Sequence, residues 1–336
     1  MDRIIVFAVG LMLTFSAQVG ARERIIVVGD AVALSYAKSV ARQFADHWAF
    51  RAPFLEVTGT GVGVGLFCAG VGYEHPDMVA TSRPMTEAER RACTARGVSD
   101  LTEIEIGRDA VALVKPVGQD PLDLTRAQLY SALARELPKA DAVEPNRADQ
   151  WSQVDLALPA VDIRVMGPEP GSSAESAFIE SVMEAGCARS PLPQRLEPEQ
   201  RVRLCTAFRT DGRYVKGAKR EDKVIRWLQD NPGALAVMSF LKAQEFSHRL
   251  ETTAIEGVRP TPETIRNGKY PLTTRFYLYV KNKHVPAIPG LQQLVYEYTS
   301  ERAIGPGGYL EAEGYIGLDD IGRNRARDSA IALGTR

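Results

Sequence analysis

A glycine-rich stretch, TGTGVGVGLFCAG at residues 58–70, constrains the fold of this chain more than any other feature. An apolar run at residues 54–57 precedes the stretch and predicts a strand, and residues 62–69 predict a short helix after it. The first N–H groups of a helix have no partner within the helix and lie at its positive end. A strand that leads through a glycine turn into a helix therefore predicts an α/β unit with a site for an oxyanion.

The spacing of these glycines bears on what the turn binds. They fall at positions 59, 61, 63 and 65, so the GxGxxG spacing of dinucleotide-binding turns is not met. The turn is not followed by Lys and then Ser or Thr, as in nucleoside triphosphate loops. We therefore expect no nucleotide cofactor. The alternative to an anion site is a turn that only lets the helix pack closely on the sheet.

The same order of strand, turn and helix recurs along the chain. Residues 24–28, apolar after Arg24, predict a strand that Gly29 turns into a long helix, and residues 77–80 predict a strand that ends in the sequence TSRP. A second glycine- and serine-rich turn, GPEPGSS at residues 167–173, leads into another predicted helix at residues 174–185. This alternation predicts a mostly parallel sheet, whose ligands gather at the carboxyl ends of the strands.

Composition and the N-terminus indicate an exported protein. The 336 residues carry a formal net charge of −1 without a basic cluster, which argues against nucleic acid as a partner. An apolar run at residues 4–17 is short for a membrane span and typical of a secretory signal, so we expect cleavage after Ala21. An uncleaved membrane anchor is the alternative.

The four cysteines fit an oxidising compartment. They fall in two local pairs, and of the three possible connectivities we favour Cys68 with Cys93 and Cys187 with Cys205. A zinc site is the alternative, but neither pair has CxxC spacing and the four histidines are scattered. We therefore expect two disulfides, no metal and no cofactor.

Eight stretches resemble a single protein family, and they occur in the family's order. They are VVGDAVALSYAKSVARQFA, VTGTGVGVGLFCAGVG, TSRPMTEAE, GRDAVALV, LTRAQLYSALA, GPEPGSSAESAF, YPLTTRFYLYV and GPGGYLEAEGYI. The family is the PstS-like proteins, the periplasmic phosphate-binding components of ABC transporters. The resemblance implies a type II periplasmic binding protein fold of class α/β. Each of its two lobes is a mostly parallel sheet flanked by helices, with a ligand cleft between the lobes.

The resemblance also implies how the chain is divided and what it does. Residues 1–21 would be the signal peptide, residues 22–115 with 272–336 would form lobe I, and residues 116–271 would form lobe II. The implied protein is a periplasmic monomer and not an enzyme. It captures inorganic phosphate or another oxyanion and delivers it to an ABC-transporter permease in the inner membrane. The alternative is an exported scaffold or sensor protein that kept the two lobes and lost the ligand.

The resemblance places the ligand site at four turns of the chain. The residues that we expect to bind the ligand are Asp30, Gly59, Thr60, Gly61, Ser82, Arg83, Ser172 and Ser173. Arg83 is the strongest candidate among them, because one guanidinium can bind two oxygens at once. Its alternative role is an ion pair at the surface or between the lobes.

Two turns depart from the family's usual residues. The first usually reads Gly-Ser-Ser-Thr, but here Asp30 and Val32 replace hydroxyl residues; the second usually reads Ser-Gly-Thr and a basic residue, but here it contains Ala174 and Glu175. A carboxylate that faces the ligand would repel an anion. As a helix cap, however, Asp30 would bind backbone N–H groups, and Glu175 could pair with Ser172 in a capping box. Phosphate binding therefore depends on which way the two acids point.

Overall fold

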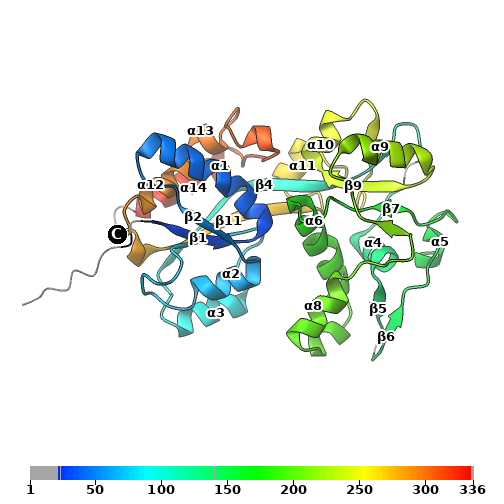
Figure 1. Ribbon diagram of the computed structural model, residues 1–336, viewed down its shortest axis with the longest axis horizontal. Helices are drawn as coiled ribbons and strands as arrows, with labels where there is room; N and C mark the ends of the chain where they lie inside the picture. Colours follow the sequence, from blue (N-terminus) through cyan, green and yellow to red (C-terminus); the bar gives the residue numbers. More distant parts are fainter. Residues whose placement is uncertain (1–21, 23, 121, 140, 334–336) are drawn as a thin grey trace, which may run out of the picture.

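The computed structural model describes residues 22, 24–120, 122–139 and 141–333, which form two α/β lobes (Figure 1). The predicted two-lobed fold is confirmed. The predicted signal segment at residues 1–21, with its cleavage after Ala21, lies outside the described residues. None of the helices in the described ranges combines the length and the apolar content that crossing a bilayer requires.

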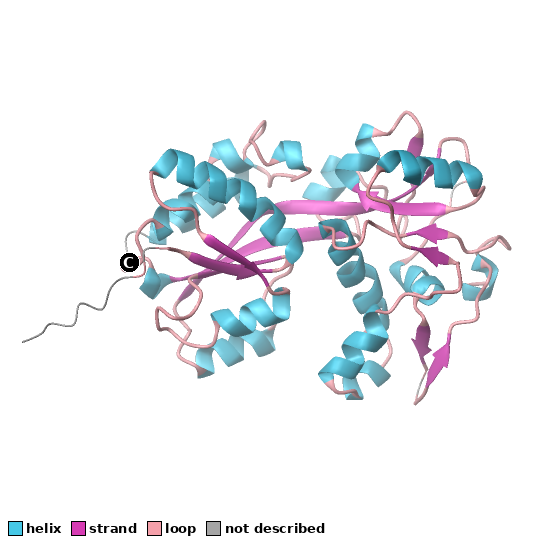
Figure 2. Cartoon of the chain, viewed as in Figure 1, coloured by secondary structure: helices cyan, strands magenta, loops and turns pink. Residues whose placement is uncertain are grey.

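Lobe I is a sheet with helices on both faces (Figure 2). Its elements are β1 (Ile26–Gly29), α1 (Ala31–Trp48), β2 (Phe54–Val57), α2 (Thr60–Phe67), β3 (Met78–Thr81), α3 (Glu87–Ala95), the first part of β4 (Leu101–Pro116), β11 (Thr273–Lys281), α12 (Leu291–Thr299), α13 (Glu301–Ile304) and α14 (Asp320–Ala332). The strand order is β2-β1-β3-β11-β4, with β1 parallel to β2 and β3. Helices α1, α12 and α14 lie on one face, and α2 and α3 lie on the other (Figure 1).

Lobe II extends the sheet through β4. Its elements are α4 (Arg126–Leu133), β5 (Glu136–Pro138), β6 (Val143–Pro145), α5 (Trp151–Val154), β7 (Val165–Met166), α6 (Ser173–Phe178), the π-helical η1 (Ile179–Glu184), α7 (Ala185–Cys187), α8 (Pro198–Thr206), β8 (Tyr214–Val215), α9 (Glu221–Asp230), β9 (Leu235–Ser239), α10 (Phe240–Glu245), β10 (Leu250–Thr252) and α11 (Pro262–Arg266). Strand order continues β4-β9-β7-β8, and β10 also pairs with β4. The sequence predicts one regular helix over residues 174–185, but a π-helical turn interrupts it at η1.

Strand β4 belongs to both lobes. From Leu101 to Ala110 its partner is β11 of lobe I, and from Val111 to Val114 its partner is β9 of lobe II. Its sixteen residues are therefore long enough to join the two lobe sheets into one nine-stranded sheet. This change of partner comes earlier in the chain than the expected lobe boundary at residue 115, which stays a prediction.

The crossing part of β4 is fixed from neighbouring segments. Arg108 and Ile316 exchange two backbone hydrogen bonds, of 3.0 and 2.7 Å, so the segment before α14 returns to the crossing point. The Tyr36 hydroxyl of α1 donates a hydrogen bond of 2.6 Å to Asp109. Helix α1 is thereby tied to the strand that carries the chain into lobe II.

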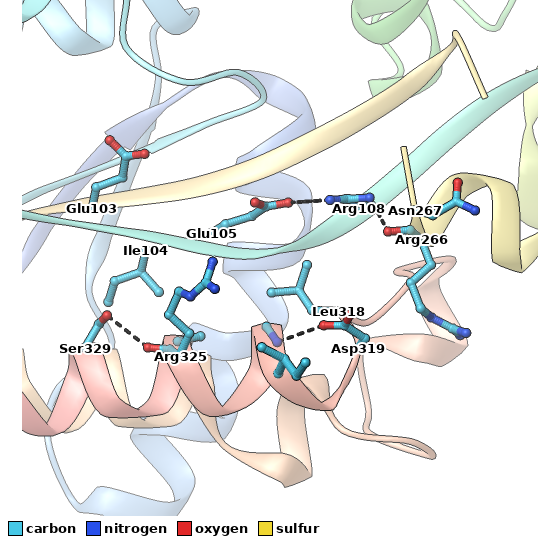
Figure 3. A pocket seen from close by; sticks show the side chains of 13 residues that line it. Glu103, Ile104, Glu105, Arg108, Arg266, Asn267, Leu318, Asp319, Arg325 and Ser329 are labelled. Atoms are coloured by element: carbon cyan, nitrogen blue, oxygen red, sulfur yellow. Dashed lines mark hydrogen bonds and ion pairs between the residues drawn. The ribbon is translucent and has the colours of Figure 1, made fainter. Parts of the chain in front are cut away.

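A cavity of about 350 Å³ lies beside this crossing, between β4, α11 and α14 (Figure 3). The Arg108 guanidinium reaches across it, binding Glu105 at 3.1 Å and the backbone carbonyl oxygen of Arg266. Its lining residues include none of the ligand residues that the sequence predicts. The cavity is therefore a feature of the crossing and not the predicted site.

Both predicted cysteine pairs are brought together. Cys68 at the end of α2 meets Cys93 of α3, with Cα atoms 4.5 Å apart, and Cys187 meets Cys205 of α8 at 5.3 Å. All four side chains are buried. Each link fastens a helix that leads away from a predicted ligand turn to a helix later in the chain.

Protein made in an oxidising compartment should contain these two intrachain links. Each closes a short loop and so restricts the unfolded chain, and reduction should therefore lower the free energy of unfolding by about 3 kcal/mol per link. Peptide mass mapping without reduction tests the pairing, with a reduced and alkylated sample as control. Free thiols at Cys68 and Cys93, or a link from Cys68 to Cys187, would contradict it.

Candidate functional site

Three of the predicted ligand turns meet where lobe I faces lobe II. In the parallel register Gly29 at the end of β1 lies beside Val57 of β2 and Ala80 of β3, so the turns after these strands are neighbours. A side chain at Gly29 would collide with the Ala80 carbonyl oxygen, because an added Cβ would lie 2.1 Å from it. Helix α1 begins at this edge and contacts α6 of lobe II. We call this region the lobe junction.

Asp30 is the centre of the lobe I half of the junction. It is only 6% exposed, and one carboxylate oxygen, Oδ1, accepts a hydrogen bond of 2.9 Å from the Ala33 N–H. The other oxygen, Oδ2, accepts from the Ser82 N–H at 2.7 Å and from the Thr60 hydroxyl at 2.9 Å. Asp30 is thus a helix cap and also binds two of the other predicted ligand residues.

This arrangement shows what the lobe I turns can bind chemically. A backbone N–H, a hydroxyl and the N-terminus of α1 direct hydrogen-bond donors at the same carboxylate, which is the environment that favours an anionic oxygen. The chain fills that environment with its own Asp30. An external anion would have to displace this carboxylate or give it a proton to accept.

The glycine turn contributes the start of α2. Gly59 is the N-cap and has a φ of 78°, which favours glycine, and the turn places the α2 N-terminus without a side-chain cap. At Gly61 an added Cβ would meet no atom within 4 Å, so close packing does not require a glycine there. The neighbouring Thr60 is the residue of this turn whose side chain binds Asp30.

Arg83 takes part in an ion pair within lobe I. Its two terminal nitrogens each lie 2.9 Å from an oxygen of Glu89, and one of them also donates to the Pro84 carbonyl oxygen at 3.0 Å. Burial acts to raise the pKa of Glu89, but the bonds from Arg83 and Thr86 outweigh it, and that pKa is lowered. The charge of the strongest predicted ligand is therefore already balanced by a carboxylate.

The lobe II turn is capped by its own residues. The Ser172 hydroxyl accepts a hydrogen bond of 3.1 Å from the Glu175 N–H, as the capping box predicts. The Glu175 carboxylate, however, accepts from the Gly171 N–H at 2.7 Å, whereas the Ser172 N–H donates to the backbone carbonyl oxygen of Glu169. The Glu175 side chain thus points back to the backbone just before the start of α6. The side chain of Ser173 lies outside what the structure describes.

Sequence reasoning missed Glu180, the residue through which lobe II reaches this site. The Ser82 hydroxyl donates a hydrogen bond of 2.7 Å to Glu180 Oε2, and Arg83 Nε lies 3.8 Å from Oε1. Burial raises the pKa of Glu180; the Asp30 carboxylate also raises it, while Ser82 and Arg83 act in the opposite direction. The available signal was spacing, since residue 180 follows residue 173 by two turns of a regular helix.

Comparison with known protein families finds one model that spans most of the chain. Residues 16–302 match the family described as the PBP superfamily domain. A curated relative, the phosphate-binding protein PstS of Staphylococcus saprophyticus, is 21% identical over 246 residues. That match covers 71% of this chain, and this chain spans 64% of the relative's length.

Solved structures share the fold at low identity. A possible phosphate-binding protein from Planctomyces limnophilus has a TM-score of 0.72 at 22% identity, covering 92% of this chain and 98% of that one. An ABC-type phosphate transport receptor from Vibrio cholerae has a TM-score of 0.60 at 16% identity, covering 87% and 99% of the two chains. These likenesses establish the two-lobed fold.

The bonds to Asp30 predict how much this side chain stabilises the fold. Asp30→Ala leaves the Ala33 and Ser82 N–H groups without their acceptor, so it should lower the free energy of unfolding by about 2–4 kcal/mol. Asp30→Asn keeps one acceptor oxygen, so it should lower the free energy of unfolding by less than Asp30→Ala does. Urea unfolding at neutral pH measures both, with Asp46→Ala on the exposed face of the same helix as control. An Asp30→Ala protein as stable as the parent would contradict the contacts described.

Proposed function

Because this chain belongs to the PBP superfamily and is PstS-like, we propose that it is a periplasmic solute-binding protein whose lobe junction captures an oxyanion, with inorganic phosphate as the first candidate. In this role it is a monomer that delivers the ligand to an ABC-transporter permease in the inner membrane. The predicted ligand residues Ser172 and Ser173 would approach from lobe II as the lobes close, a hinge motion about β4.

One observation supports the oxyanion more than any other: the convergence of donors on the Asp30 carboxylate. Ser82 N–H and the Thr60 hydroxyl bind the same oxygen, at 2.7 and 2.9 Å. Separate segments of lobe I therefore cooperate to hold one negatively charged oxygen. A phosphate oxygen has the charge and acceptor geometry to take that place.

The same carboxylate determines which form of phosphate can bind. At about 4 Å and an effective dielectric constant near 20, a carboxylate repels each unit of negative charge by roughly 4 kcal/mol, so the dianion suffers twice the penalty of the monoanion. The monoanion also carries O–H groups, one of which can donate to Asp30. We therefore assign the protonated monoanion as the bound form.

The second candidate is an exported two-lobed scaffold or sensor that no longer binds phosphate. The contact between Arg83 and Glu89 favours it, since a guanidinium bound by two carboxylate oxygens at 2.9 Å has little attraction left for a ligand. The two candidates differ in one measurable property, which is whether any phosphate binds near the pH where the monoanion prevails.

Phosphate should bind more tightly in acid than in base. On going from about pH 8 to about pH 5.5 the ligand changes from mostly dianion to mostly monoanion, and the raised pKa of Glu180 means that its carboxylate begins to lose its charge earlier than usual. Both changes reduce repulsion, so affinity should rise at least about tenfold, or ~1.4 kcal/mol. Calorimetry at constant ionic strength measures this.

Sulfate is the control ligand for that titration, because it stays dianionic over the same range and has no proton to donate. It should bind at neither pH. If phosphate gives no binding heat at either pH, the scaffold or sensor role is favoured. Tight phosphate binding that does not change with pH would identify a phosphate carrier in which Asp30 plays no part.

Asp30→Ser should strengthen phosphate binding at about pH 8. The change removes a negative charge and frees the Ser82 N–H and the Thr60 hydroxyl for the ligand, so we expect a gain of at least about 100-fold, or ~3 kcal/mol. Asp46→Ser removes the same charge from the far end of α1 and is the matched control. Equal affinities in parent, Asp30→Ser and Asp46→Ser would exclude Asp30 as the residue that limits binding.

A further inference from the structure

Glu180 of lobe II contacts side chains of lobe I across the lobe junction. This residue belongs to the π-helical turn of lobe II, yet its carboxylate accepts the Ser82 hydroxyl at 2.7 Å and lies 3.8 Å from Arg83 Nε, both in lobe I. Ser82 and Arg83 are two of the predicted ligand residues. A carboxylate from one lobe therefore occupies positions on the other lobe that an anionic ligand would use.

The position of this carboxylate is electrostatically costly, which argues against an incidental surface pair. Glu180 faces the Asp30 carboxylate of lobe I, and Glu184 follows it on the same turn, so two like charges oppose its ionised form. Arg83 attracts it, but Arg83 is shared with Glu89. The repulsion from Asp30 and the contacts with Ser82 and Arg83 all act between the lobes, and it is these two contacts that hold the Glu180 carboxylate beside a like charge.

We propose that Glu180 is an interlobe latch: its carboxylate stands in for an anionic ligand on Ser82 and Arg83, holds the empty protein closed, and must leave when an oxyanion binds. The displacement of Glu180 by an oxyanion rests on the proposed function. The contact that holds the lobes together concerns the ligand-free protein alone. Opening of the lobes in the absence of ligand can therefore be measured whether or not phosphate binds.

Glu180 lies in the π-helical turn η1, between α6 and α7. Residues 179–184 are wound with one extra residue per turn between the regular helices α6 and α7, and such turns shift the side chains that follow relative to the regular helix. Glu180 is partly exposed, with 32% of its side chain accessible, so its replacement leaves the core of lobe II intact. Variants at this position should therefore fold.

Small-angle X-ray scattering of the ligand-free protein at about pH 8 tests the latch directly. Glu180→Ala removes both contacts and should shift the radius of gyration to a larger value, because the lobes separate; Glu180→Gln keeps an acceptor for Ser82 and should give a smaller shift. Glu184→Gln removes a like charge from the same turn and leaves the bond between Ser82 and Glu180 in place, so it should not enlarge the radius. An unchanged radius in Glu180→Ala, or an equal shift in Glu184→Gln, would overturn the latch.

Phosphate calorimetry on the same variants separates the latch from the proposed function. If both hold, Glu180→Gln should bind phosphate about tenfold more tightly than the parent, since the ligand no longer competes with a charged occupant, and Glu184→Gln should gain less. If the lobes of Glu180→Ala open but no variant binds phosphate, the latch stands and phosphate is rejected as the ligand. If the parent binds phosphate but the lobes of Glu180→Ala do not open, phosphate stands as the ligand and the latch is rejected.

Discussion

The Asp30 carboxylate is the interaction on which the lobe junction depends. It ends β1, starts α1 and binds the turns that follow β2 and β3, so a single side chain fixes the relative positions of all three lobe I turns. Buried N–H groups need an acceptor, and here the acceptor is an anion that the chain itself supplies. The donors of the junction therefore already hold an anionic oxygen. In the proposed function, an oxyanion would either share that position with Asp30 or replace it.

The fold converts this local contact into a property of the whole molecule. Because β4 is part of both lobes, the proposed closure would bend the molecule near the point where β4 changes its partner, between Ala110 and Val111. Asp30 and Glu180 lie on opposite sides of the lobe junction. Like charges brought together by closure favour proton uptake, whereas Arg83 and Ser82 favour the ionised carboxylate. In the proposed latch, these few charged and polar groups set the balance between closed and open forms.

Features that depend on residues near one another in the sequence, or on the order of strands, could be predicted from the sequence. Contacts that form between the two lobes could not. The two local cysteine pairs are brought together, and the turns with Asp30, Thr60 and Ser82 do meet, because parallel strands end at one edge. The contact of Glu180 with Ser82 joins residues 98 positions apart, and it forms only where the two lobes meet. The alternative role of Arg83, an ion pair, is present, but the sequence does not single out its partner Glu89 among the nearby acidic residues.

The most direct test of this account is the crystal structure of the Asp30→Ser protein with phosphate. If the lobe I donors form an anion site that Asp30 normally fills, a phosphate oxygen will lie within about 3 Å of the Ser82 nitrogen and the Thr60 hydroxyl, where the Asp30 carboxylate now stands. A phosphate bound elsewhere, or a junction in which these two donors have turned to other protein atoms and leave no anion between them, would contradict the central claim.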